Sequence, residues 1–66
     1  MAVARVTEII AGSKKSFDDA LQKGVDRACA TLKNVEGVWV QDQKLIISKG
    51  KIAEYRVNMK VTFILE

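Results

Sequence analysis

The feature that most constrains the fold is a strict two-residue alternation at the C-terminal end of the chain. In IAEYRVNMKVTFILE, residues 52–66, apolar and polar side chains take turns almost throughout. The apolar set is Ala53, Tyr55, Val57, Met59, Val61, Phe63 and Leu65, and the polar set is Glu54, Arg56, Asn58, Lys60 and Thr62. Successive side chains of a β-strand point to opposite faces, so the pattern predicts one long strand with a single buried face.

Two shorter strands and a turn are predicted upstream. Residues 3–10, VARVTEII, are rich in β-branched side chains and predict a strand that ends at residues 11–12. Residues 37–47 predict a second strand. Residues 48–51, SKGK, then predict a tight turn, because glycine adopts a positive φ without strain.

A helix is predicted between these two strands, starting after Ser16. Ser16 precedes Asp19 by three residues, which is the spacing of a capping box. Apolar and small residues follow at i, i+3 and i+4 spacing and predict one buried face, formed by Phe17, Ala20, Leu21, Gly24, Val25, Ala28 and Leu32. Gly24 costs about 1 kcal/mol of helix propensity relative to alanine. Either it is simply tolerated, or a sheet backbone or a large side chain lies close to it.

The order strand, helix, strand, strand predicts an α+β fold for residues 1–66, taken as a single domain. A right-handed crossover that places the long strand in the middle gives a three-stranded antiparallel sheet of order 1-3-2 with the helix on one face. By strand parity, the other face would carry Trp39, Gln41, Gln43, Leu45, Ile47, Arg56, Asn58 and Lys60. This is too much apolar surface to leave exposed in a monomer.

Association is the expected source of additional stability. Below roughly 70–80 residues a single core seldom contributes more than about 3–5 kcal/mol, and small scaffolds usually add disulfides, a metal or oligomerisation. The chain of 66 residues has one cysteine and no histidine, which excludes an intramolecular disulfide and a Cys/His zinc site. We therefore predict a closed homo-oligomer without a metal site.

Composition argues against several classes of function. Without histidine, no recognisable constellation of catalytic side chains is present, so we predict that the chain is not an enzyme. Its net charge is +3, but eleven basic residues are interspersed with eight acidic ones, which does not favour a nucleic-acid partner. We expect no membrane span and no signal peptide, and hence a cytoplasmic protein.

Several short motifs, taken together, resemble the dodecins, which are small flavin-binding proteins of βαββ fold that assemble into hollow dodecamers. The resemblance extends without a gap from Val3 to Glu66. It rests on GSKKSF at 12–17, DRA at 26–28, TLKNV at 31–35, DQ at 42–43, Tyr55 and VTFIL at 61–65. It implies a homododecamer that binds a flavin, such as riboflavin, FMN or FAD, between its subunits.

The ligand site is where the chain departs from this family. The position of the family's stacking tryptophan holds Gly37, and the glutamine that follows its conserved aromatic residue is replaced by Arg56. Trp39 lies two positions further on, with the same strand parity and about 6.6 Å away. The candidate cofactor-binding residues are thus Trp39, Gly37, Gln43 and Arg56.

Two hypotheses from different classes remain open. In the first, the oligomer binds and stores a flavin-type small molecule, and Trp39 stacks on it. In the second, the chain is a shell-forming structural homologue that has lost flavin binding or binds another anion or a metal ion. Trp39 would then fill a subunit interface, and Arg56 would pair with Glu54 or with an acid of a neighbour.

Overall fold

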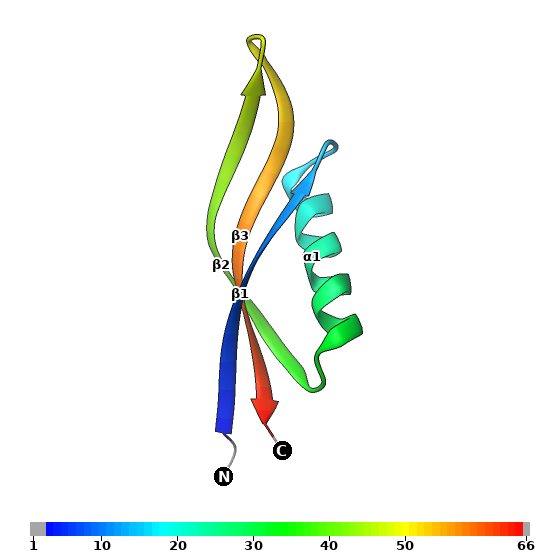
Figure 1. The fold of residues 1–66 in the computed structure, drawn as a ribbon, viewed down its shortest axis with the longest axis vertical. Coiled ribbons are helices and arrows are strands. Elements are labelled where there is room, and N and C mark those ends of the chain that lie inside the picture. The colour runs from blue at the N-terminus through cyan, green and yellow to red at the C-terminus, as the bar shows by residue number, and fades with distance from the viewer. Residues whose placement is uncertain (1–2, 66) are drawn as a thin grey trace.

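The structure, a computed structural model, describes residues 3–65 of the chain. Its elements are β1 (Val3–Ser13), α1 (Phe17–Thr31), β2 (Val35–Ser48) and β3 (Lys51–Leu65). Figure 1 shows α1 lying beside a long, strongly twisted sheet. The predicted α+β class and the order of the elements are confirmed, and β1 and β2 are each longer than predicted.

The three strands form one antiparallel sheet of order β1-β3-β2, as the crossover argument predicts. Helix α1 packs on one face of this sheet, which we call the helix side, and the opposite face is called the open face. Directly paired residues of neighbouring strands point to the same face, so the register assigns each residue to one of the two. The turn between β2 and β3 has positive φ at Lys49 (54°) and Gly50 (75°), as a two-residue hairpin requires.

The core lies where α1 crosses the middle of β3. Val57, Met59 and Val61 of β3 have no exposed surface, and they pack with Ala20 and Ala28 of α1. These residues belong to the two apolar stripes that the sequence predicts for the strand and the helix.

Gly24 allows the helix to approach Met59 closely. A Cβ atom built on Gly24 would lie 2.6 Å from Cε and 2.9 Å from Sδ of Met59, and 3.2 Å from Cβ of Ala11. The predicted close approach is therefore confirmed, and the large side chain is a methionine.

We expect Gly24→Ala to destabilise the protein although alanine is the better helix former. Overpacking a filled core costs about 1–3 kcal/mol, against a propensity gain of about 1 kcal/mol. In a Met59→Ala background the same substitution should cost much less, because the methionine end that it would strike is gone and only the 3.2 Å contact with Cβ of Ala11 remains. Urea denaturation of the four variants of this double-mutant cycle measures the coupling, and additive effects would contradict the packing described.

Helix α1 is too short to cover the whole sheet. Its 15 residues rise about 22 Å as a helix, whereas the 15 residues of β3 extend about 50 Å. The core is accordingly limited to the middle of β3, and Ala53 and Leu65 at the ends of its apolar set are exposed. Figure 1 shows the β2–β3 hairpin extending past the helix. Large exposed apolar residues of this hairpin end are Leu45, Ile47 and Ile52. No helix within residues 3–65 is long and apolar enough to cross a membrane.

A small polar cluster fixes the start of α1 to the end of β1. The Ser16 hydroxyl accepts a hydrogen bond from the backbone N–H of Asp19 at 3.0 Å, which confirms the predicted N-cap. The Asp19 carboxylate accepts a hydrogen bond from the hydroxyl of buried Ser13 and lies 3.3 Å from Nζ of Lys23. The Ser13 hydrogen bond, and to a smaller extent Lys23, lower the pKa of Asp19.

This pKa shift predicts a pH-dependent contribution to stability. Because the pKa of Asp19 is lower in the folded chain, its ionised form favours folding above the ordinary carboxyl pKa of 3.8, and the contribution is lost as the pH falls through the folded value. Asp19→Asn should therefore lower the free energy of unfolding at neutral pH, and its difference from the wild type should shrink as the pH falls below 3.8. Urea denaturation over this range, with Asp18→Asn as the control in the same turn, checks this. A difference that does not vary with pH would contradict it.

Candidate ligand site on the open sheet face

The open face is arranged in three rows, each formed by directly paired residues of β1, β3 and β2. We call them the Trp39 row, the Asn58 row and the Arg56 row. They consist of Glu8, Lys60 and Trp39; of Ile10, Asn58 and Asp42; and of Gly12, Arg56 and Lys44. Adjacent rows are two residues apart along β3, so they lie about 6.6 Å apart, and the outer rows about 13 Å apart.

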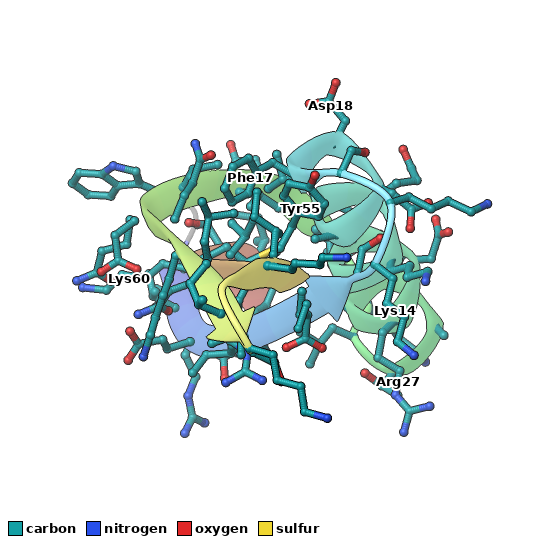
Figure 2. All side chains as sticks on the ribbon, turned by 90° about the horizontal axis from the view of Figure 1, so that it is seen from above. Lys14, Phe17, Asp18, Arg27, Tyr55 and Lys60 are labelled. Carbon is teal, nitrogen blue, oxygen red and sulfur yellow. The ribbon has the colours of Figure 1, made fainter. Side chains whose placement is uncertain are left out.

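Trp39 stands almost free on this face, with 73% of its surface exposed. It pairs with Lys60 of β3 and lines, with Gln41 and Lys60, a shallow depression of about 230 Å³. Figure 2 shows Lys60 on the side of the sheet away from α1. An indole this exposed offers a flat apolar surface on which an aromatic ring can stack.

Gly37 shares the open face with Trp39, as predicted from strand parity. Gly37 pairs with Thr62 and Trp39 with Lys60, and these partners are two positions apart on β3. Among the described residues, nothing lies within 4 Å of a Cβ built on Gly37. The face is thus open at the position where the resemblance places the family's tryptophan.

The placement predicted for Gln43 and Leu45 on the Trp39 face is wrong. A β-bulge at Gln41 separates Val40, which pairs with Met59, from Asp42, which pairs with Asn58. The extra residue shifts the alternation by one, so Gln43 pairs with Val57 and Leu45 with Tyr55 on the helix side.

The same bulge turns two charged residues, Asp42 and Lys44, onto the open face, and the sequence analysis missed both. Asp42 pairs with Asn58, and Lys44 pairs with Arg56. The segment QDQK is polar at every position, so its alternation gives no sign of where the register changes. Only the pairing with β3 brings these two charges into the candidate site.

Tyr55 lies on the helix side, where it packs against the first turn of α1. Its ring and that of Phe17 form an edge-to-face pair with centroids 5.2 Å apart and an interplanar angle of 77°. Figure 2 shows the two residues side by side. Tyr55 therefore supports the fold beneath the site and is not part of the open face.

Arg56 is held by an acidic neighbour on its own strand. Its Nε and Nη2 donate hydrogen bonds to Oε2 of Glu54 at 3.0 and 2.5 Å. The Glu54 carboxylate lies close to the backbone of Gly12, which has no side chain. A Cβ atom built on Gly12 would be 2.6 Å from Oε1 of Glu54. The pairing of Arg56 with Glu54 that was left open as an alternative is thus present, and it offsets part of the arginine charge.

A hollow of about 290 Å³ occupies the Asn58 row and the Arg56 row. It is lined by Ile10, Asp42, Lys44, Arg56 and Asn58. Oδ1 of Asn58 is buried and has no hydrogen-bond partner among the described residues. Lys44 and Arg56, which pair directly across the strands, carry like charges, and such a pair is unfavourable unless other groups offset it.

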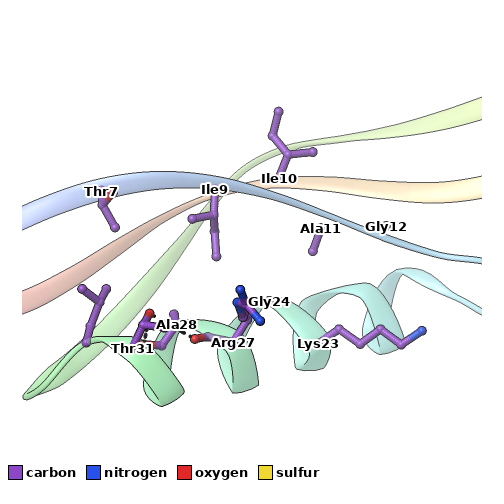
Figure 3. A pocket seen from close by; sticks show the side chains of 11 residues that line it. Thr7, Ile9, Ile10, Ala11, Gly12, Lys23, Gly24, Arg27, Ala28 and Thr31 are labelled. Atoms are coloured by element: carbon purple, nitrogen blue, oxygen red, sulfur yellow. Dashed lines mark hydrogen bonds between the residues drawn. The ribbon is translucent and has the colours of Figure 1, made fainter.

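A larger groove of about 710 Å³ runs between α1 and the free edge of β1 (Figure 3). Its apolar walls include Ile9, Ala11, Ala28 and Leu32, and Lys23 and Arg27 also line it. The groove contains none of the candidate cofactor-binding residues. Within residues 3–65, no group of three or more His, Cys, Asp or Glu side chains is placed to hold a metal ion.

The fold and this face define a class of protein: a short βαββ chain whose sheet is covered by one helix on one side and carries an exposed aromatic residue on the other. The family model for dodecin matches residues 3–66, and the chain therefore belongs to the dodecin family. The resemblance stated from the sequence motifs is thereby confirmed.

Solved structures agree with this assignment. The dodecin of Streptomyces davaonensis is 35% identical, with a TM-score of 0.92 over 98% of this chain and 96% of the other. That of Streptomyces coelicolor is 32% identical, with a TM-score of 0.93 over 98% and 93%. A calcium dodecin from Mycobacterium tuberculosis, described as having a calcium-binding site, is 25% identical, with a TM-score of 0.86 over 97% and 91%. No curated protein sequence matches the chain.

Proposed function

We propose that the chain assembles into a closed homo-oligomer, a dodecamer of the dodecin type, which binds and stores a flavin-type small molecule on the open face. The observation that carries this proposal is Trp39, an indole that is 73% exposed on the sheet face that α1 leaves uncovered. Membership of the dodecin family supports the ligand class. Binding and storage, not catalysis, is the proposed activity, and a cytoplasmic location stays a prediction.

The ligand ring would stack on Trp39 within the shallow depression that Gln41 and Lys60 also line. Stacking on a fixed aromatic side chain gives affinity without demanding a particular hydrogen-bond pattern. Gly37 leaves room beside it, and Arg56 lies two rows away, with its guanidinium turned to Glu54. Gln43 is not included, because it lies on the helix side.

Assembly is proposed because the protomer leaves apolar side chains and sheet edges uncovered. Val6 and Ile10 on β1 and Ile47 and Ile52 at the hairpin end are each at least half exposed. A closed point group covers such surfaces and leaves no free strand edge. Light scattering at low micromolar concentration should give the mass of a dodecamer of 7.3 kDa chains, and a mass near that of one chain would refute assembly.

Titration of the purified oligomer with riboflavin, followed by quenching of flavin fluorescence, tests ligand binding. Gly37→Trp should strengthen binding by about 1–3 kcal/mol, because it places a second stacking surface in open space. Gly37→Ala is the matched control and should leave the affinity unchanged. Protein that takes up no riboflavin, and gains none with Gly37→Trp, would contradict the proposed function.

The second candidate function is a shell-forming structural homologue without flavin. Two observations favour it: Gly37 offers no side chain for stacking, and Arg56 is already paired with Glu54. A protein of this kind would assemble fully, purify colourless and quench no added riboflavin. Binding of another anion or of a metal ion belongs to the same alternative, and titration calorimetry with phosphate or calcium would detect it.

A further inference from the structure

We infer that the groove between α1 and the free edge of β1 binds a medium-chain fatty acid, with the carboxylate at Arg27 and the alkyl chain along the apolar walls. The volume of the groove, about 710 Å³, is in the range of small-molecule sites. None of the residues proposed to bind flavin lines it, so this inference is independent of the proposed function.

The length of the groove suits an extended alkyl chain. Its helix wall runs from Lys23 to Leu32, about 14 Å, and its sheet wall runs from Thr7 to Gly12, about 17 Å. Figure 3 shows Thr7 and Thr31 at one end of the groove, and Gly12 and Lys23 at the other. An extended chain advances about 1.2 Å per bond, so the groove takes a chain of about ten carbon atoms.

The half of the groove near Leu32 is uncharged. Ile9, Ala11 and Leu32 pack on the core but are only partly buried, so they leave apolar surface in the groove. The Thr31 hydroxyl donates a hydrogen bond to the backbone carbonyl of Arg27 at 3.3 Å, so its donor is already paired. An alkyl chain that lies here removes apolar surface from water and breaks no hydrogen bond.

The other half of the groove carries positive charge. Lys23 and Arg27 lie one turn apart on α1, and among the described residues no carboxylate lines the groove. Lys23 is paired with Asp19 at 3.3 Å, whereas Arg27 forms no ion pair within residues 3–65. Figure 3 shows the Arg27 side chain beside Gly24, between α1 and β1. A guanidinium can bind a carboxylate through two parallel hydrogen bonds, so an anionic head group complements this end.

The same charges disfavour the hairpin end of a second copy as the occupant. Its exposed apolar residues Ile47 and Ile52 flank the turn that carries Lys49 and Lys51. Insertion of this end would bring two lysines toward Arg27, and like charges at an interface are unfavourable. A fatty acid combines an apolar chain with a negative charge, and it therefore matches both halves of the groove.

The test is titration calorimetry of the purified oligomer with octanoate, decanoate and decanol at neutral pH. The affinity for the carboxylates should rise about two- to fourfold for each added methylene. Arg27→Gln should lower the decanoate affinity about fivefold and leave the decanol affinity unchanged. Arg5→Gln is the matched control, because Arg5 is an exposed arginine of β1 that does not line the groove.

A second pair of variants tests the place of binding. Thr31→Phe puts a large ring into the uncharged half and should abolish decanoate binding, whereas Ala30→Phe adds the same ring at an exposed position outside the groove and should not. Both variants should bind riboflavin as the wild type does, because the flavin is proposed to lie on the open face. The outcome for flavin therefore does not decide the outcome for the fatty acid.

Three results would overturn the inference. Decanoate that binds equally well to wild type and to Thr31→Phe would be bound at other exposed apolar residues. Equal losses with Arg27→Gln and Arg5→Gln would show a general effect of charge. If decanoate does not bind and Arg27→Glu lowers the mass in light scattering, a second copy occupies the groove.

Discussion

Met59→Ala is expected to lower the free energy of unfolding by about 2–5 kcal/mol and to weaken assembly along with it. Met59 has no exposed surface, and its terminal atoms fill the space that Gly24 leaves on α1. A small domain with a total stability of about 5–15 kcal/mol can lose much of it through one such cavity. Circular dichroism in urea, combined with light scattering, measures both effects.

Lys60→Ala is the matched control for this prediction. Lys60 is the next residue of β3 and points to the open face, where it pairs with Trp39 and Glu8. Its truncation creates no cavity in the core and should cost well below 1 kcal/mol. Comparable losses in Met59→Ala and Lys60→Ala would mean that the faces of β3 are assigned the wrong way round.

Trp39→Ala is expected to remove about 1–3 kcal/mol of flavin binding and to leave the assembled shell intact. The physical reason is that the indole is 73% exposed in its own protomer and so offers a free surface for stacking. Trp39→Phe, which keeps a smaller aromatic ring, should retain most of the affinity. Fluorescence titration gives the affinity, and light scattering on the same samples gives the mass.

The contrary outcome has a distinct signature. If Trp39 anchors a subunit interface, Trp39→Ala dissociates the oligomer, because a buried anchor contributes about 2 kcal/mol or more for each copy. Symmetry repeats that loss at every equivalent contact. If Trp39→Ala dissociates the oligomer and the wild-type protein binds no flavin, the protein is the shell-forming structural homologue of the second hypothesis.

Local sequence signals predicted the elements because each of them repeats or has a specific chemistry. The alternation in β3 extends over many positions, so that no single residue decides it. The cap at Ser16 needs only a hydroxyl three residues before Asp19. Gly24 marked a close helix-to-sheet contact because glycine is unfavourable in a helix unless something requires it.

The candidate site was predicted only in part. Trp39, Gly37 and Arg56 share the open face as strand parity indicated, whereas Gln43 does not. The apolar set of β3 was expected to be buried along its whole length, but Ala53 and Leu65 at its ends are exposed. Alternation shows which side chains share a face, but only the length of α1 decides how many of them it covers.

The sequence alone determined the βαββ order, the antiparallel 1-3-2 sheet and the family. The order of the elements and the family depend on periodicity, turn chemistry and short motifs, all of which are local along the chain, and the strand order follows when the right-handed crossover rule is applied to that order. Tertiary structure alone decided the make-up of the open face, because the bulge at Gln41 shifts the register of β2 within a segment that is polar at every position. Pairing with β3 fixes which of those polar residues face the site, and that pairing depends on residues far away in the sequence.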